Sequence, residues 1–291
     1  MRYSTELRAV LESDGFVVCP AVHDPLTARV VELLDFEAAY MTGYGSSLSV
    51  TGYPDAGLIT MPEIVEHAGN VQETLSVPLV ADADTGYGNA TNVVRTVREY
   101  IRAGVGGVHI EDQAVPKRCG TVAGKEYIDR EEAVGKIRAA VDTRDERDPD
   151  FVIIGRSDVD DVEEAIARVN AFAAAGADLV YPSGVKTPAE LRAVGERVDA
   201  PLMYTNAAVG SKPIVDPTTL DEWGFDVAVY WDISMLATVL GTYSALRRLE
   251  AGDSSVLDEL AAAFEELPVE DFHEFAGFSE IFEWEERYLE N

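Results

Sequence analysis

Short apolar runs alternate with longer amphipathic segments along most of this chain of 291 residues. Between the runs, segments such as 89–104 and 129–144 carry apolar residues at helical spacing. A strand followed by a helix, repeated eight times, predicts an α/β fold, a (β/α)8 TIM barrel whose parallel strands are buried on both faces. The eight predicted strands lie within residues 16–24, 36–43, 77–84, 105–112, 151–158, 177–183, 201–206 and 226–232.

The predicted barrel domain occupies residues 1–250, and residues 251–291 form an additional C-terminal helical segment. This segment has apolar residues at helical spacing, such as Val256 and Leu260, and it is rich in aromatic residues. Aromatic rings need to be buried, so the segment is expected to pack on its own barrel or on a partner subunit. The residues alone leave both possibilities open.

The predicted strands begin with apolar residues and end with polar ones. Asp82 and Asp84 end the third strand, Glu111 ends the fourth, and Arg156 ends the fifth. Barrel enzymes assemble their active sites at the carboxyl ends of several strands. Solvent exposure of strand ends does not by itself explain such clusters on three successive strands. The pattern therefore predicts a catalytic site at this rim.

Asp82 and Asp84 stand two residues apart, so their side chains point to the same side of a strand. Two converging carboxylates repel each other unless a cation or a proton lies between them. Mg²⁺ takes one or two carboxylates and keeps several waters, which predicts a magnesium site here. Glu111 is expected to complete it, directly or through water. The alternative is a chance Asp-x-Asp in an acidic chain, and its position at a strand end disfavours that alternative.

The composition is strongly acidic, which bears on the partners of the protein and on the medium in which it works. Asp and Glu number 53 against 23 Lys and Arg, giving a formal net charge of −30, while 47% of residues are hydrophobic. The apolar fraction excludes a disordered acidic chain. The charge disfavours nucleic acid and anionic membranes as partners, because their phosphates would be repelled. Five of the basic residues are lysines. Such an acidic, lysine-poor composition resembles the proteins of salt-loving organisms, in whose medium salt screens the repulsion.

Two further absences bear on location. The sequence has no apolar run typical of a signal peptide and none long enough to span a membrane. The two cysteines, Cys19 and Cys119, argue against a disulfide framework. A soluble, cytoplasmic protein is expected.

The loop after the fourth predicted strand concentrates unusual residues around Cys119. It holds Lys117 and Lys125, two of the five lysines, and Arg118 directly precedes the thiol. Positive charge beside a thiol favours the thiolate, which makes Cys119 a candidate acid, base or nucleophile. The alternative is a bystander in a loop. Cys19 lies within an apolar strand and is expected to be a core residue.

Other residues at the rim could bind carboxylates. Arg156 could hold a substrate carboxylate through two parallel hydrogen bonds. The alternative for Arg156 is an ion pair with Asp158 or another acid of the rim. The backbone amides near Gly43 and Gly45 could bind a second carboxylate. His109 lies in the middle of a strand and is expected to be a core residue.

Together these motifs resemble the isocitrate lyase and phosphoenolpyruvate mutase superfamily, and within it the methylisocitrate lyase group. The resemblance covers about residues 15–250, and the PKRCG loop after the IEDQ strand is highly specific. It implies a Mg²⁺ enzyme, with Mn²⁺ as a substitute, that cleaves a carbon–carbon bond in a 2-hydroxy di- or tricarboxylate. It also implies that the eighth helix is swapped between subunits in a homotetramer, a dimer of helix-swapped dimers. The matching stretches are AAYMTGYG, GYPDAG, ADADTGYGN, GVHIEDQAVPKRCG, GKEYIDREEAVGKIRAA and FVIIGRSD.

Carried over residue by residue, the resemblance implies a role for each candidate. Asp82 and Asp84 would hold Mg²⁺, with Asp55 and Glu111 in its water shell. Cys119 would be the general acid that protonates the carbanion left after cleavage, beside Lys117 and Arg118. Tyr40 would lie near the hydroxyl that loses its proton. The residues expected to bind substrate are Thr42, Gly43, Tyr44, Gly120, Arg156, Ser183, Thr205 and Asn206.

The chain departs from the family pattern at several of these positions. Thr121 stands where the family usually has histidine, and Ser183 where it has glutamate. Thr205 aligns with a family asparagine, for which the adjacent Asn206 could substitute. The family arginine near the start of the eighth helix is missing from DISMLATVLG. The resemblance therefore implies retained retro-aldol chemistry and leaves the substrate open, with 2-methylisocitrate first and isocitrate second. The products would be pyruvate or glyoxylate, together with succinate.

Two alternatives of different kinds stay open. One is an oxaloacetate- or alkylmalate-cleaving relative, or a phosphonopyruvate-type enzyme, on the same barrel. Cys119 disfavours the phosphonate mutases, which carry asparagine in place of the cysteine. The other is a barrel that has lost activity and acts as a binding protein, supported by the altered pocket residues.

Overall fold

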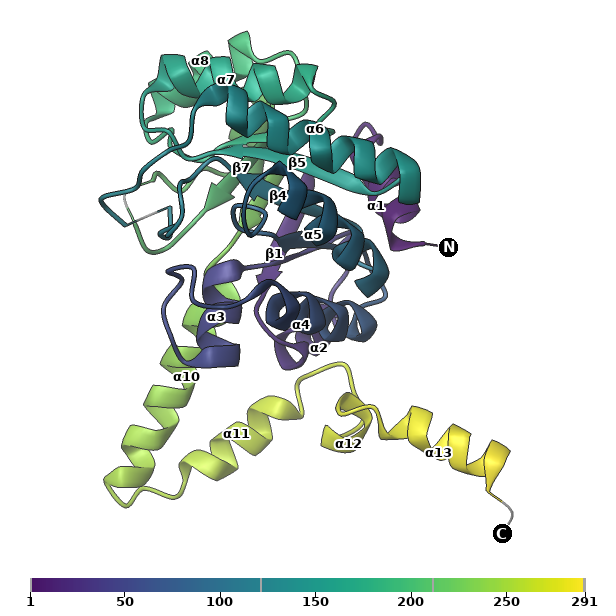
Figure 1. Cartoon of the computed structure of the whole chain (residues 1–291). Helices are drawn as coiled ribbons and strands as arrows, with labels where there is room; N and C mark the ends of the chain where they lie inside the picture. Colours follow the sequence, from purple (N-terminus) through teal and green to yellow (C-terminus); the bar gives the residue numbers. More distant parts are fainter. Residues whose placement is uncertain (1, 121, 211, 290–291) are drawn as a thin grey trace. The chain divides into compact units, whose positions relative to one another are not determined.

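The computed structural model describes residues 2–120, 122–210 and 212–289, and eight parallel strands form its barrel (Figure 1). Hydrogen-bonded neighbours follow the order β6-β5-β4-β3-β2-β1-β8-β7, and a parallel bridge between Val180 and Leu202 brings β6 to β7. The predicted TIM barrel is confirmed. The strands are β1 (Val17–Val22), β2 (Ala39–Met41), β3 (Leu79–Asp82), β4 (Gly107–Glu111), β5 (Val152–Ser157), β6 (Leu179–Pro182), β7 (Met203–Asn206) and β8 (Val227–Tyr230).

The helices that lie between successive strands in the sequence cover the outside of the barrel (Figure 1). Helices α5, α6 and α7 lie side by side along β4 and β5 (Figure 1). The helices are α1 (Tyr3–Leu11), α2 (Pro25–Val31), α3 (Gly43–Thr51), α4 (Met61–Thr74), α5 (Ala90–Ala103), α6 (Arg130–Arg147), α7 (Val162–Ala174), α8 (Pro188–Arg197), α9 (Pro217–Glu222), α10 (Ile233–Glu250), α11 (Val256–Phe264), α12 (Phe272–Phe275) and α13 (Phe278–Tyr288).

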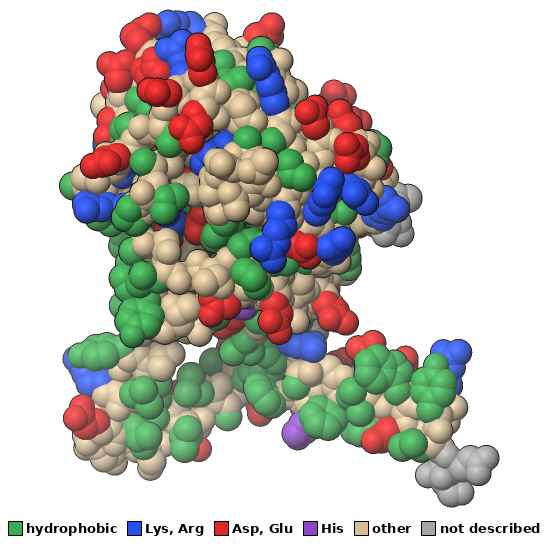
Figure 2. Space-filling view, viewed as in Figure 1, with side chains coloured by type: hydrophobic (Ala, Val, Ile, Leu, Met, Phe, Trp, Pro, Cys, Tyr) green, Lys and Arg blue, Asp and Glu red, His purple; other side chains and the backbone are tan. Residues whose placement is uncertain are grey.

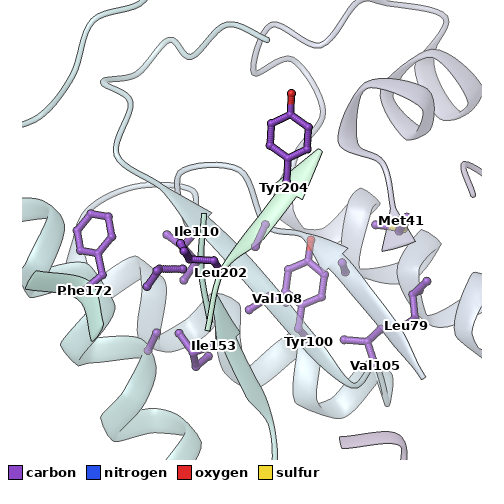
Figure 3. Packing of buried hydrophobic residues seen from close by; sticks show 14 of the residues in the cluster. Met41, Leu79, Tyr100, Val105, Val108, Ile110, Ile153, Phe172, Leu202 and Tyr204 are labelled. Carbon is purple, nitrogen blue, oxygen red and sulfur yellow. The ribbon is translucent and has the colours of Figure 1, made fainter. Parts of the chain in front are cut away.

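Alternation along each strand divides the core into two clusters. Val17, Cys19 and Ala21 of β1 pack inside the barrel, together with Leu7 of α1. Cys19 is therefore the core residue that the sequence predicts, and burial raises the pKa of its thiol to about 12. The larger cluster lies between the strands and the covering helices, as Figure 3 shows for residues such as Ile153. A strand of this barrel therefore has one row of side chains facing inward and one facing the helices.

The chain divides into two compact units, Met1–Met235 and Leu236–Asn291. The boundary falls near the start of α10, so the second unit begins before residue 251. Helices α10 to α13 carry many exposed apolar side chains, such as Leu240, Tyr243 and Trp284 (Figure 2). Asp and Glu side chains are spread over the visible face of the barrel unit (Figure 2). No helix in the described ranges is long and apolar enough to cross a membrane.

Candidate active site

The polar residues at the barrel mouth continue the inward-facing rows of the strands. Asp82 follows Val80 by two positions, and Arg156 follows Ile154 by two. These rows open into a cavity of about 380 Å³. The predicted site residues that line it are Tyr40, Thr42, Tyr44, Asp55, Asp82, Cys119, Gly120, Arg156, Ser183 and Thr205.

Beneath the cavity, carboxylates gather around Lys117. The Lys117 ammonium forms ion pairs with Asp55 and with Asp84, the latter at 2.5 Å. The Asp84 backbone N–H donates to Asp82 Oδ1 at 2.8 Å, and the Tyr100 hydroxyl donates to the Asp82 carbonyl at 2.8 Å. These bonds fix the end of β3. The structure thus brings two of the predicted metal residues, Asp55 and Asp84, to one lysine and ties a third, Asp82, to Asp84.

Burial separates the protonation behaviour of the two aspartates. It raises the pKa of Asp84 to about 6, and the nearby charges of Asp82 and Asp55 act in the same direction. For Asp82, burial also acts upward, but His109, Lys117 and Arg156 outweigh it and hold the pKa of this carboxyl below its usual value. Burial raises the pKa of Glu111 well above its usual value, against the opposing charge of Arg156. The pKa values of the acids at the mouth are therefore shifted in opposite directions, upward for Asp84 and Glu111 and downward for Asp82.

Strand register places Glu111 directly beside Arg156. Arg156 Nη1 lies 3.1 Å from Glu111 Oε2, and the guanidinium donates two further bonds of 2.9 Å to the Asp158 carboxylate. Both alternatives considered for Arg156 therefore have a basis: it lines the cavity, and it is paired with acids of the rim. Its charge is already balanced within the protein.

Gly43 allows the Asp82 carboxylate to approach the start of α3. A Cβ at this position would lie 2.8 Å from Asp82 Cγ, closer than real Cβ contacts come. Thr42 is buried directly before the helix and lines the cavity with Tyr44. The YMTGYG stretch thus packs against the third strand at the mouth.

Tyr40 and His109 form a buried pair. The sequence predicts Tyr40 as a site residue, but it predicts His109 only as a core residue. The Tyr40 hydroxyl lies 2.6 Å from His109 Nε2, and the same nitrogen lies 3.4 Å from Asp82 Oδ1. Burial lowers the pKa of His109 to about 4 and raises the pKa of Tyr40 well above its usual value. His109 is fully buried, as predicted, but it belongs to the site. Its spacing of two from Glu111 would have indicated this.

The loop after β4 brings Cys119 to the cavity, and its backbone N–H donates to the Asp55 carbonyl at 3.2 Å. The two lysines of this loop turn to other partners. Lys117 enters the carboxylate cluster, and Lys125 donates to the carbonyls of Gly120 at 3.1 Å and Asp158 at 3.0 Å. Arg118 is exposed and donates to the Ala123 carbonyl. The departure at Thr121 lies outside the described residues.

Thr205 and Asn206 are adjacent in β7, so their side chains face opposite sides of the strand. Thr205 follows the interior residue Met203 by two positions and lines the cavity. Asn206 belongs to the other row, and its amide exchanges two hydrogen bonds with the backbone of Val215, at 2.8 and 2.9 Å. Asn206 therefore anchors the chain after β7. Ser183 lines the cavity near Gly120 and Arg156.

Sequence reasoning missed Tyr181 and Lys212, which also line the cavity. Tyr181 stands two residues before Ser183 in the same inward row, so strand spacing could have found it. Lys212 lies in the loop after β7, beyond any strand pattern. Its signal was the scarcity of lysine in the chain.

The residues at the mouth fit Mg²⁺. The described residues contain no ready-made group of three His, Cys, Asp or Glu ligands, but Mg²⁺ needs only one or two carboxylates and completes its shell with water. Glu111 Oε1 is buried without a hydrogen-bond partner in the described structure. Buried carboxylates also outnumber buried cations, which favours a divalent ion. The carboxylates belong to Asp55, Asp82, Asp84, Glu111 and Asp158, and the cations to Lys117, Lys125 and Arg156.

Comparison with known families decides the relationship. Residues 7–248 match the family described as phosphoenolpyruvate phosphomutase. The chain belongs to the phosphoenolpyruvate mutase/isocitrate lyase superfamily. The resemblance predicted from the sequence is thereby confirmed.

Relatives within the superfamily carry several activities. The chain is 37% identical over 293 residues to 2,3-dimethylmalate lyase of Eubacterium barkeri, covering 99% of each chain. It is 35% identical to 2-methylisocitrate lyase of Aeropyrum pernix, covering 92% of this chain and 87% of the relative. The crystal structure of phosphonopyruvate hydrolase with oxalate and Mg²⁺ is 30% identical, with a TM-score of 0.83 and full coverage of both chains. The two lyases among these relatives support a carbon–carbon lyase, and the relatives together leave the substrate undecided.

Proposed function

We propose that this protein is a Mg²⁺-dependent lyase that cleaves a 2-hydroxy dicarboxylate of the alkylmalate class into a 2-oxo acid and a smaller carboxylate. The observation that carries the proposal is that Tyr40, Asp82, Cys119 and Arg156 line one cavity of about 380 Å³. Retro-aldol cleavage needs a proton acceptor for the hydroxyl, positive charge at the oxygen that becomes a carbonyl, and a proton donor for the carbanion.

Tyr40 is the proposed contact for the substrate hydroxyl. As the hydroxyl loses its proton to Tyr40, the Tyr40 proton moves to His109 Nε2, which lies 2.6 Å away. A histidine whose pKa is lowered to about 4 by burial is neutral at pH 7 and has a lone pair for this bond. The C2–C3 bond then breaks and C2 becomes the ketone carbon of the 2-oxo acid. The electron pair of the broken bond stays on C3 of the departing carboxylate, which becomes a carbanion.

Cys119 is the proposed proton donor to that carbon. It lies on a loop at the cavity wall, and Lys125 ties this loop to the end of β5 through the carbonyls of Gly120 and Asp158. A closed loop keeps water away from the carbanion, so the proton comes from the thiol. Gly120 lets this loop approach Arg156 closely, since a Cβ would lie 3.0 Å from Arg156 Nη2.

Asp82 and Asp84 are the proposed Mg²⁺ ligands, with Asp55 and Glu111 reached through water. When bound, Mg²⁺ supplies positive charge to the 2-oxygen and the adjacent carboxylate of the substrate. Lys117 holds Asp55 and Asp84 in place and limits their mutual repulsion.

The dicarboxylate class is supported by the similarity to the relative named 2,3-dimethylmalate lyase. Ser183 and Thr205, which replace a family glutamate and asparagine, line the cavity and are consistent with an altered substrate. The methylisocitrate lyase relative favours a second candidate, 2-methylisocitrate, and isocitrate follows it. Both stay predictions. An assay of alkylmalates, 2-methylisocitrate, isocitrate and oxaloacetate side by side, in molar KCl with Mg²⁺, ranks them by kcat/KM.

Cys119→Ser tests the mechanism. We expect it to remove nearly all turnover while Mg²⁺ and pyruvate still raise the melting temperature, because the hydroxyl keeps the loop contacts but donates its proton poorly. Cys19→Ala, inside the barrel, is the matched control and is expected to keep turnover. A near-normal rate for Cys119→Ser would contradict the assignment. Absence of any melting shift with pyruvate or glyoxylate in the unaltered protein would favour an inactive barrel.

A homotetramer of helix-swapped dimers is part of the proposal. It is supported by the exposed apolar side chains of α10 to α13, which need a covering surface. Light scattering in molar KCl measures the oligomeric state.

A further inference from the structure

Lys212 occupies a held position on one wall of the cavity. Its Nζ donates to the Tyr181 hydroxyl at 3.2 Å and lies 3.5 Å from Thr205 Oγ1. The ammonium also lies over the rings of Tyr181, at 5.1 Å, and Tyr204, at 5.5 Å. Cation–π contacts and a hydroxyl acceptor restrict a flexible side chain. The Lys212 ammonium is therefore held at one position at the cavity wall and is not free to move through solvent.

Lys212 differs from the other lysines of the mouth in its charge balance. Lys117 is paired with Asp55 and Asp84, and Lys125 and Lys186 are both paired with Asp160. Within the described ranges, Lys212 has no carboxylate at ion-pair distance, although the chain carries 53 Asp and Glu. Arg156 is already held by Glu111 and Asp158. Lys212 is thus the pocket cation whose charge a ligand can balance.

The barrel order places Lys212 across the mouth from the carboxylate cluster. Thr205 and Tyr181 belong to β7 and β6, whereas Asp82 and Tyr40 belong to β3 and β2. In an eight-stranded closed order, these two pairs stand on opposite sides. A ligand whose hydroxyl end lies at Asp82 and Tyr40 therefore extends its other end toward Lys212.

Tyr181 adds a second polar group to this wall. Its hydroxyl shares a 2.5 Å hydrogen bond with Thr205 Oγ1. Burial acts to raise the pKa of Tyr181, but the charges of Lys212 and Arg156 and the hydrogen bonds of Ser183 and Thr205 outweigh it and lower the pKa below its usual value. The Arg156 guanidinium lies 5.5 Å from the Tyr181 ring. The wall is therefore electropositive, which suits an anionic group.

We propose that Lys212, with the hydroxyls of Tyr181 and Thr205, forms the subsite that binds the carboxylate of the departing fragment and so selects substrates with a second acid group. This inference rests on the proposed function, because it assumes that a 2-hydroxy acid binds at the opposite wall. In this scheme Lys212 determines substrate specificity and has no role in proton transfer. One unbalanced ammonium matches one distal carboxylate, in keeping with a dicarboxylate.

A matched pair of ligands tests the subsite. Malate and 2-hydroxybutyrate share the 2-hydroxy acid, and in 2-hydroxybutyrate a methyl group replaces the second carboxylate. Calorimetry in molar KCl with Mg²⁺ gives the dissociation constant of each. We expect the unaltered protein to bind malate about 10- to 100-fold more tightly, as a charge-assisted hydrogen bond provides. Lys212→Met is expected to reduce this preference to about onefold and to leave 2-hydroxybutyrate binding unchanged.

Two further variants complete the design. Lys186→Met removes a lysine of the same rim that Asp160 already balances, and we expect it to keep the preference for malate. Tyr181→Phe is expected to weaken the preference several-fold by removing the hydroxyl that holds Lys212. Unchanged 2-hydroxybutyrate binding shows in each case that the variant is folded.

The outcomes separate the two proposals. A preference for malate that survives in Lys212→Met overturns the subsite and leaves the proposed function standing. Equal loss of both ligands in Lys212→Met also overturns the subsite, because the lysine then supports the whole site. Failure of the unaltered protein to bind either ligand overturns the proposed function and the subsite with it.

Discussion

Gly43→Ala tests most directly whether the position of the Asp82 carboxylate matters for the function of the site. The added methyl would lie 2.8 Å from Asp82 Cγ and closer still to Oδ2, whereas ordinary contacts of a Cβ begin at 3.4 Å. Asp82 is buried, its backbone N–H and C=O groups are fixed in β3, and Tyr100 holds its carbonyl. The carboxylate therefore has to move, because the strand cannot.

The required displacement sets the size of the effect. The Asp82 carboxylate has to move by at least about 0.6 Å, and functional groups need to be held to within about 0.5 Å. A misplacement of about 1 Å costs on the order of 100-fold in rate. We therefore expect kcat/KM to fall by about 100-fold and Mg²⁺ affinity to fall with it. Overpacking is expected to lower the free energy of unfolding by about 1 to 3 kcal/mol.

Calorimetric titration with Mg²⁺ and a steady-state lyase assay measure these effects separately. Gly135→Ala is the matched control, since a Cβ at that position of α6 meets nothing within 4 Å. It is expected to keep activity and to raise the free energy of unfolding by about 0.5 to 1 kcal/mol. Gly43→Ala with unchanged Mg²⁺ affinity and kcat/KM would refute the reasoning that Asp82 works at this position.

Two predictions concern the medium. In the metal-free protein, burial raises the pKa of Asp84 to about 6, so the carboxylate needed for Mg²⁺ is present above pH 6 and is lost below it. Mg²⁺ affinity is expected to fall about tenfold per pH unit below 6, and Asp84→Asn is expected to abolish this dependence; a flat profile in the unaltered protein would contradict it. The net charge of −30 predicts a melting temperature that rises from dilute buffer to molar KCl, because salt screens the repulsion. Sucrose at equal osmolality is the control, and an equal rise in sucrose would show that charge is not the cause.

The fold could be predicted from the sequence because burial on both faces makes each strand a continuous apolar run. The site could be located because the runs end in polar residues at one rim. The alternation of inward-facing and outward-facing side chains along each strand carries further information about the site. It separates Thr205 from Asn206, and it would have brought His109 into the site with Glu111. Lys212 could not be placed, because a loop after a strand has no period from which a direction can be inferred.

The partners of charged side chains were also beyond the sequence. Lys117 was expected to act on the Cys119 thiol, and in the folded chain its ammonium lies among Asp55 and Asp84 instead. For Arg156 the sequence left a substrate carboxylate and an ion pair with Asp158 both open, and the structure adds a pairing with Glu111 across two strands. Such pairings depend on which rows meet across the barrel, and register between strands far apart in sequence decides this.

The distribution of lysines makes the surface of this protein nearly free of reactive side-chain amines. Lys117 and Lys136 are buried, and the side chain of Lys125 is covered at the cavity wall. This leaves Lys186 and Lys212, and both border the cavity. A reagent that reacts with lysine side chains, such as an acylating dye or a resin with aldehyde groups, would therefore attach its lysine-bound label at the barrel mouth. Modification of Lys186 and Lys212 would block the entrance of the cavity, and protection of these two lysines from labelling would report whether the cavity is filled.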